Sequence, residues 1–207
     1  MMSAFFTVKL SKREGGQSRH RLFFSIFSVF FCSAVLFMAI DPESSWAKSA
    51  PDYQIKAGFI YRFLSFIDLP ETPEEGKDDE FLIGVIGDKA ILNELMLTKG
   101  NRIRGKTVGV EAVDADAPGS ILSKYHVMFI GKSLGSRMEE ILARTENMPM
   151  LTVSDDSSFI QKGGIIQFVE SEGKIRFVIN LAAAEAKHLV IHSRLKRVAL
   201  QLTGERE

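Results

Sequence analysis

Histidines and a pair of adjacent aspartates are the residues of this chain with the clearest capacity for chemistry. The histidines are His20, His126, His188 and His192. Asp155 and Asp156 directly follow Ser154, but a hydrolytic serine needs a Gly-x-Ser-x-Gly turn, and no glycine stands beside Ser154. We therefore interpret the two aspartates as the cap of a short helical turn, with one carboxylate toward the helix amides and the other toward water.

A metal site would need converging ligands. His188 and His192 are four residues apart, and the apolar Leu189-Val-Ile between them is typical of a strand. In a strand, such positions share a face at about 13 Å, too far apart for one zinc ion. No cysteine or third ligand joins them, so we expect structural or surface histidines and no metal.

Gly131-Lys-Ser133 has the composition of a phosphate-binding loop. That loop also needs a glycine five residues before its second glycine, and His126 occupies the position. Nucleotide hydrolysis is therefore not expected, and we predict no cofactor. Two interpretations stay open: an anion site on amides near Ser133 to Ser136 at a helix start, or an ordinary strand-to-helix turn.

A small basic cluster of Arg102, Arg104 and Lys106 lies in a predicted turn. Such a cluster is usually a solvated loop, although it could also meet an acidic partner. Basic and acidic residues are balanced over the whole chain, at 26 each. Because nothing in this distribution predicts a basic face, we expect no binding to nucleic acid.

The N-terminal segment has the pattern of an export signal. Basic residues precede an apolar run at 22–40, and Ser45-Trp-Ala47 follows as a small-x-small cleavage site. We predict a signal peptide at 1–47, with an uncleaved anchor as the alternative, and an exported domain at 48–207. Cys32, the single cysteine, lies inside the leader, so the exported domain would contain no disulfide.

Repeated strand-then-helix units predict the architecture of the exported domain. Apolar runs at 81–87, 126–130 and 150–153 read as buried strands, each followed by a helix or helical turn. Ile165–Val169 and Lys174–Ile179 flank Glu-Gly and predict a hairpin. The fold class is therefore α/β: a single domain whose mostly parallel sheet is flanked by helices on both faces, with an antiparallel edge hairpin.

Helices are predicted at both ends of this domain. Residues 52–69, before Pro70, read as a helix, and Ser193 can cap a last helix that runs to about Leu200. The first helix carries four aromatic side chains, Phe59, Tyr61, Phe63 and Phe66. Aromatics at helical spacing usually pack into a core, but they are also enriched at protein interfaces. We keep these four, with Arg102 and Arg104, as candidates for contact with a partner.

Several of these segments resemble the YfiR family of periplasmic regulators. The resemblance rests on Tyr53–Tyr61, Ile83–Gly87 and the stretch from Leu151 to Asn180, and it covers roughly residues 52–200. The matching positions in that stretch include Ser154, Asp155, Gly163, Gly164 and Asn180, to which we assign structural roles. Family members can carry disulfides, and this chain departs from them in that respect.

The resemblance implies a regulatory function without catalysis. YfiR-like proteins repress a membrane-bound diguanylate cyclase by binding its periplasmic part, which lowers cyclic-di-GMP and biofilm formation. An outer-membrane lipoprotein relieves the repression by sequestering them, and they form homodimers. The alternative is a periplasmic solute-binding or sensor domain, with a small ligand at the strand carboxyl ends near Gly87-Asp88, Gly131–Ser133 and Ser154-Asp155. A periplasmic enzyme is a third and weaker interpretation.

Overall fold

The computed structural model describes residues 50–70 and 80–204. These residues belong to one compact unit, residues 50–207, and the predicted leader at 1–47 lies outside them. None of the helices within the described ranges is both long and apolar enough to span a bilayer. The helical segments are α2 (Asp52–Phe63), α3 (Lys89–Met96), α4 (Gly119–Leu122), η1 (Lys132–Arg137), α5 (Met138–Arg144), α6 (Leu181–Ala186) and α7 (Ser193–Val198).

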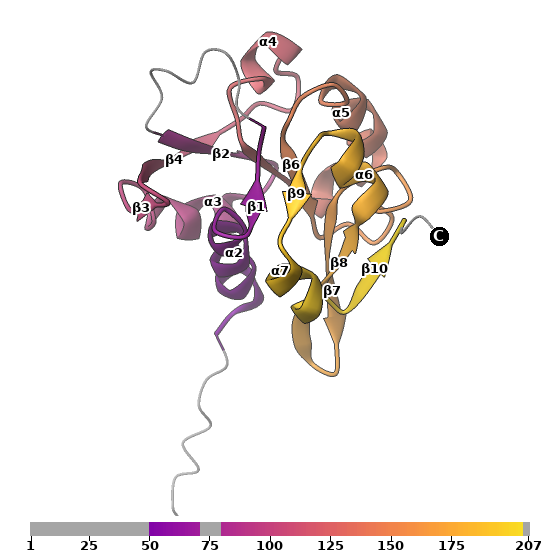
Figure 1. The fold of residues 1–207 in the computed structure, drawn as a ribbon. Helices are drawn as coiled ribbons and strands as arrows, with labels where there is room; N and C mark the ends of the chain where they lie inside the picture. Colours follow the sequence, from indigo (N-terminus) through magenta and orange to yellow (C-terminus); the bar gives the residue numbers. More distant parts are fainter. Residues whose placement is uncertain (1–49, 71–79, 205–207) are drawn as a thin grey trace, which may run out of the picture. The chain divides into compact units, whose positions relative to one another are not determined.

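Within the same residues, the main sheet has eight strands in the order β10-β8-β7-β6-β5-β2-β4-β3 (Figure 1). Its strands are β2 (Glu80–Ile86), β3 (Arg102–Ile103), β4 (Lys106–Ala112), β5 (Val127–Ile130), β6 (Leu151–Ser154), β7 (Ile166–Ser171), β8 (Lys174–Asn180) and β10 (Gln201–Thr203). Neighbouring strands are parallel except for the β3–β4 and β7–β8 pairs. A separate antiparallel ribbon pairs β1 (Ile67–Asp68) with β9 (Val190–Ile191).

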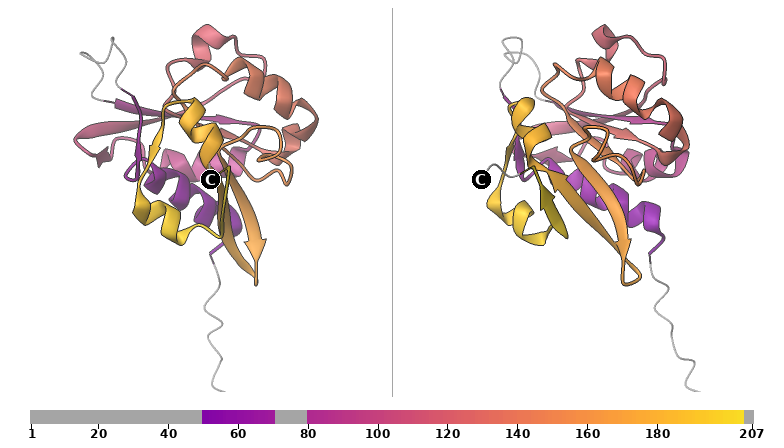
Figure 2. Two further views of the ribbon diagram at one scale, coloured as in Figure 1. Left: turned by 45° about the vertical axis from the view of Figure 1, so that its right-hand side comes forward. Right: turned by 90° about the vertical axis from the view of Figure 1, so that its right-hand side faces the viewer.

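The α/β fold with a mostly parallel sheet and an antiparallel hairpin is therefore confirmed. The hairpin does not form the edge of the sheet, however. Its tip extends beyond the other strands (Figure 2), but β10 pairs in parallel with the outer side of β8. The last helix also differs from the prediction, because it ends at Val198 rather than near Leu200. Three residues are too few to show strand periodicity, so β10 was missed.

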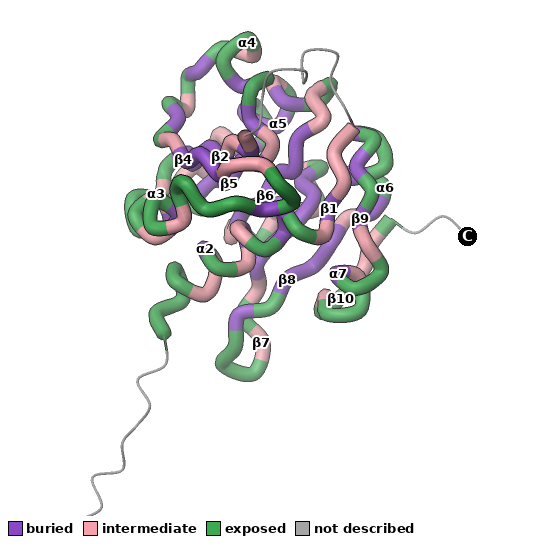
Figure 3. Tube along the Cα trace, turned by 60° about the vertical axis from the view of Figure 1, so that its left-hand side comes forward, coloured by how far each residue is buried: buried purple, intermediate pink, exposed green. Residues whose placement is uncertain are grey.

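Side-chain alternation on the central strands creates a core on each face of the sheet. On β5, Val127 and Phe129 point into one cluster, while Met128 and Ile130 point into the other. Helices α2, α3, α6 and α7 cover the first face, and α4 and α5 cover the second. Every residue of β5 and β6 is buried, and purple, the colour of buried residues, is prominent around the central strands in Figure 3. Burial on both faces explains why these strands are apolar runs rather than alternating patterns.

Side chains cap the first turns of α3 and α6. The Asp88 carboxylate accepts a hydrogen bond from the Ile91 amide at 3.0 Å, and the Asn180 side chain accepts one from the Ala183 amide at 3.1 Å. These bonds satisfy amides that the first turns of α3 and α6 leave without a helical partner. Each cap therefore fixes where a strand ends and the following helix begins.

The first helix is shorter than predicted. It ends at Phe63, and Ile67 pairs with Ile191 instead of continuing the helix. The apolar residues after Phe63 fit a helical pattern, so local sequence favours a longer helix. Pairing with a segment far along the chain overrides that preference, and it creates a two-stranded ribbon, β1–β9, at the surface of the domain.

Candidate interaction surface

The β1–β9 ribbon has one buried face and one open face. Ile67 and Ile191 are opposite each other and are 1% and 6% exposed. Since side chains alternate along a strand, their neighbours Asp68 and Val190 must lie on the other face. Val190 is 59% exposed, which is high for a β-branched apolar side chain. The open face of this ribbon is the candidate interaction surface.

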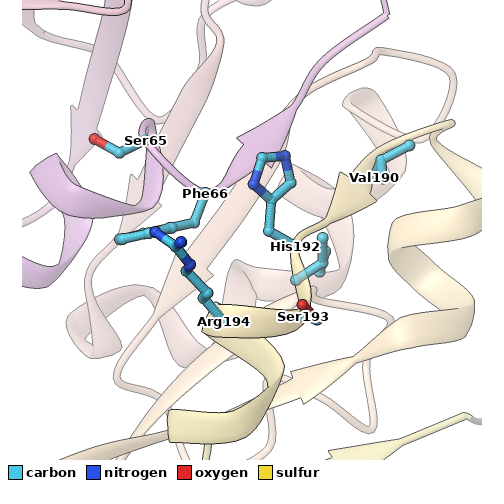
Figure 4. Close-up of a pocket in the computed structure, with 7 residues that line it drawn as sticks. Ser65, Phe66, Val190, His192, Ser193 and Arg194 are labelled. Atoms are coloured by element: carbon cyan, nitrogen blue, oxygen red, sulfur yellow. The ribbon is translucent and has the colours of Figure 1, made fainter.

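A hollow of about 430 Å³ lies on this open face (Figure 4). Its lining residues are Ser65, Phe66, Val190, Ile191, His192, Ser193 and Arg194. The Arg194 side chain extends toward Phe66 in this view. A smaller hollow of about 190 Å³ shares Val190 and Ile191 with the first and is otherwise lined by residues of α6, α7 and Leu189. An apolar side chain flanked by concave surfaces is a common feature of the centre of protein interfaces.

A carboxylate holds the ribbon to a neighbouring turn. Asp68 Oδ2 lies 2.8 Å from His192 Nε2, and Asp68 Oδ1 lies 2.7 Å from Arg104 Nη1. Arg104 also donates a hydrogen bond to the Ile67 carbonyl at 3.2 Å. An ionised carboxylate can only accept, so His192 donates through Nε2–H. The hydrogen bond from His192, followed by the bond and charge of Arg104, lowers the pKa of Asp68 despite the opposing effect of burial.

The four aromatic candidates separate into core and surface. Phe63 is completely buried, and its ring lies 5.2 Å from that of Phe177 between centroids. Phe59 is half-buried and contacts the same ring at 5.4 Å. Tyr61 is also half-buried and packs against the core. Phe66 alone among the four lines the hollow, so it is the aromatic that this conformation offers to a partner.

The two arginine candidates make contacts within the chain. Arg102 donates a hydrogen bond to the Gly105 carbonyl, and Arg104 pairs with Asp68. Both side chains therefore stabilise the β3–β4 turn and its contact with β1. Arg104 already has an acidic partner within the chain, whereas Arg102 stays exposed, so contact of Arg102 with an outside partner stays a prediction.

Asp155 does not face water, contrary to the expectation. Its Oδ2 lies 2.7 Å from Lys56 Nζ, and its Oδ1 accepts the Lys132 amide hydrogen at 3.0 Å. The side chains of Lys56 and Asp155 are only 14% and 7% exposed. The neighbouring Asp156 does act as the predicted cap, because it accepts a bond from the Ser158 amide at 2.9 Å. Asp155 thus joins α2 to the carboxyl ends of β5 and β6.

The crevice between the ends of β2 and β5 is filled by the chain itself. Ser133 Oγ donates a hydrogen bond to the Gly87 carbonyl at 3.0 Å. A Cβ placed on Gly131 would lie 2.9 Å from the same carbonyl oxygen, and one on Gly87 would lie 2.8 Å from Leu134. Parallel sheets usually bind ligands at such a switch point. Here the backbone and side chains of η1 already occupy that position.

The remaining family-pattern residues make structural contacts. Ser154 is buried, and its hydroxyl donates to the Ile130 carbonyl at 2.6 Å. Gly163 has φ of +90°, which ends the turn after β6. A Cβ on Gly164 would lie 2.2 Å from the Phe159 ring, so this position has no room for a side chain. These contacts agree with the structural roles assigned from the sequence.

His126 and His188, the other histidines within the described residues, lie in separate parts of the chain; His20 lies outside the described residues. His126 accepts the Leu82 amide hydrogen at Nδ1, at 3.1 Å. His188 is exposed at a left-handed backbone position, with φ of 58°. Within residues 50–70 and 80–204, no three His, Cys, Asp or Glu side chains converge as a metal site would require.

The sequence did not single out Val190 or Arg194, and it indicated only a structural or surface role for His192. The surface is made by pairing Ile67 with Ile191, which are far apart in the chain. Each strand of the ribbon has two residues, so neither shows a period of its own. One available signal was Val190, an apolar residue next to a run of basic side chains.

A family model shows the class of this domain. The family model described as YfiR/HmsC-like matches residues 53–200. No curated protein matches the chain. A crystal structure titled as a conserved domain protein from Vibrio cholerae O1 biovar El Tor strain N16961 is 15% identical, with a TM-score of 0.53. The match covers 73% of this chain and 60% of that one, so it concerns the fold alone. An ABC domain in complex with L-Trp from Streptococcus pneumoniae is 13% identical, covers 59% and 55%, and has a TM-score of 0.44.

Proposed function

This chain belongs to the YfiR/HmsC-like family of periplasmic regulators, and from that premise we propose that it represses a membrane-bound diguanylate cyclase by binding its periplasmic part. Repression lowers cyclic-di-GMP and, with it, biofilm formation. The observation that carries this proposal is the extent of the family match, which spans both hydrophobic cores and the β1–β9 ribbon. The chain acts in this role after export through its N-terminal signal peptide.

The open face of the ribbon is the surface we assign to the cyclase. It combines an exposed apolar residue, Val190, with a hollow that includes Phe66 and Arg194. Aromatic residues and Met are enriched in interfaces, and arginine is among the residues that dominate the binding energy. The strand-end positions favoured by the sensor interpretation are occupied by Ser133 and by the Lys56–Asp155 pair, which supports contact over ligand binding.

Repression requires a preference between two states of the cyclase. A bound protein shifts a conformational equilibrium only by the difference in its affinity for the two conformations. To turn a cyclase that is about 99% active into one that is about 99% inactive, that difference must reach roughly 10⁴-fold. No chemical step is needed, so the proposal assigns this chain no catalytic activity.

Two further partners belong to this proposal on the strength of the family. An outer-membrane lipoprotein would relieve repression by sequestering the regulator, and the regulator would act as a homodimer. Sequestration works if the lipoprotein and the cyclase compete for one surface, whereas the homodimer rests on the family alone. Size-exclusion chromatography with light scattering of the exported domain tests the dimer directly.

The decisive experiment measures cyclic-di-GMP in a deletion strain. We expect a rise on deletion and a return to the wild-type level when the chain is supplied from a plasmid with its leader. A second arm adds the purified domain to a full-length cyclase in lipid nanodiscs and measures its turnover of GTP. If neither the deletion nor the addition changes cyclase output, the proposal is wrong, and a thermal-shift screen for small ligands becomes the next test.

A further inference from the structure

The C-terminal part of the described chain has an unbalanced charge. Residues 186–204 contain no Asp or Glu, but they contain Lys187, Arg194, Lys196 and Arg197. Arg194 and Arg197 are exposed, and no ion pair in the described part of the chain involves either of them or Lys196. Arg104, by contrast, is already paired with Asp68. The cations beside the ribbon that no ion pair among the described residues engages therefore lie on α7.

The outer edge of β9, near these cations, faces the smaller hollow rather than another described strand. His192 donates its amide hydrogen to the Phe66 carbonyl at 2.9 Å, so His192 and Phe66 are a hydrogen-bonded pair of residues at the end of the ribbon. Because hydrogen-bonded and non-bonded pairs alternate in antiparallel strands, the amide and carbonyl of Ile191 point away from β1. Among the described strands, β9 pairs with β1 alone. The smaller hollow, between β9 and α6, is also lined by Ile191.

These two features meet at Val190, which lies between the hollows and is 59% exposed. We infer that the β9–α7 surface binds an extended, acidic segment of a partner protein. The segment adds as a strand beside β9, bonding to the Ile191 backbone, with an apolar side chain over Val190. Its carboxylates lie near Arg194, Lys196 and Arg197. Strand addition supplies affinity through backbone bonds, and flanking side chains supply specificity.

An anionic membrane would also attract these cations, but the geometry favours a peptide. A lipid surface forms no ladder of hydrogen bonds with a strand edge, and it does not fill concave hollows as a side chain does. The helix α7 presents no continuous apolar face to a bilayer, because Leu195 is 4% exposed and packs in the core, which leaves Val198 as its single exposed apolar residue. The inference deepens the proposed function, on which it depends only for the identity of the partner.

Site-specific photo-crosslinking in living cells tests the inference. The full chain is produced with p-benzoylphenylalanine at Val190 or, as a control, at Leu97, which is 77% exposed on the far end of α3. We expect an adduct from position 190 to a protein segment that carries several Asp or Glu residues, and none from position 97. The double charge reversal Arg194→Glu/Arg197→Glu should lower the yield about tenfold. The matched reversal Lys89→Glu/Lys99→Glu should not change it.

Each other outcome overturns the inference. No adduct at position 190, an adduct to lipid, an adduct within this chain, or an adduct to a segment without acidic residues would each contradict it, as would a yield unaffected by the α7 reversal. A cyclase adduct from position 97 alone would contradict the surface while supporting the function. An acidic adduct at position 190, combined with unchanged cyclic-di-GMP on deletion, would support the surface and contradict the function.

Discussion

Lys56 Nζ lies 2.7 Å from Asp155 Oδ2, and this ion pair joins the first helix to the end of a central strand. Both side chains are largely buried, so removal of one partner leaves a charge without compensation. We expect Asp155→Asn to reduce the free energy of unfolding by about 3 kcal/mol, measured by urea denaturation followed by circular dichroism. Asp116→Asn removes an exposed carboxylate and should leave stability nearly unchanged.

The double variant Lys56→Met/Asp155→Leu separates charge from geometry. Replacement of both charges by apolar side chains removes the uncompensated ion, so it should recover most of the lost stability. If the double variant were no more stable than Asp155→Asn, the Lys132 amide bond rather than the ion pair would be the main contribution of Asp155.

Lys187 predicts a pH dependence of stability on the alkaline side. Its side chain is 9% exposed and donates a hydrogen bond to the Thr145 carbonyl, and burial lowers the pKa of its ammonium to about 8. Between that pH and the unfolded pKa of about 10.4, the unfolded chain binds more protons, so stability from this group rises with pH. Below pH 8 the contribution is constant, because both states are protonated.

We therefore expect the free energy of unfolding of the wild type, minus that of Lys187→Met, to increase by on the order of 2 kcal/mol from pH 7 to pH 10. Taking the difference removes the contributions of Tyr125 and other groups that titrate in this range. If this difference in the free energy of unfolding did not change with pH, the Lys187 ammonium would be hydrated in solution rather than buried.

Val190 predicts loss of function without loss of stability. Val190→Asp places a charge on the open face of the ribbon, where it should prevent partner binding and raise cyclic-di-GMP to the level of a deletion strain. The free energy of unfolding should change by less than about 0.5 kcal/mol, as for most exposed positions. Leu97→Asp is the matched control, since Leu97 is also exposed, and it should retain repression. Equal effects of both substitutions would contradict the assigned surface.

Two glycines should respond to alanine in opposite directions. Gly58 is exposed within α2, and a Cβ there meets nothing within 4 Å, so Gly58→Ala should stabilise the domain by about 0.5–1 kcal/mol. A Cβ on Gly164 would lie 2.2 Å from the Phe159 ring, so Gly164→Ala should destabilise it by about 1–3 kcal/mol. Thermal melting of the two variants in parallel measures both changes.

The sheet could be predicted because its signals are local. The strands around Phe129 and Val153 are apolar runs of the expected length, and Asp88 and Asn180 have the residue types and positions of helix caps. The hairpin around Gly173 followed from its turn composition, and Gly173 has the positive φ that such a turn requires. Each of these features depends on neighbours within a few residues.

The interaction surface could not be predicted, because it depends on contacts between distant residues. Residues 64–67 continue a helical pattern, yet Ile67 pairs with Ile191, and Arg104 turns out to be bound to Asp68. Phe63 shows the converse error, since an aromatic residue proposed for an interface lies wholly in the core. Composition indicates which residues suit an interface, but only tertiary pairing determines which of them remain accessible.

The β1–β9 ribbon has a consequence for quality control in the envelope. Its two strands come from opposite ends of the described domain, so Asp68 lies beside His192 only when both ends are in their native positions. A partner that recognises this ribbon therefore distinguishes a finished molecule from a partly folded one. Misfolded copies would not compete for the partner, so the activity of the partner would depend only on the number of correctly folded regulators.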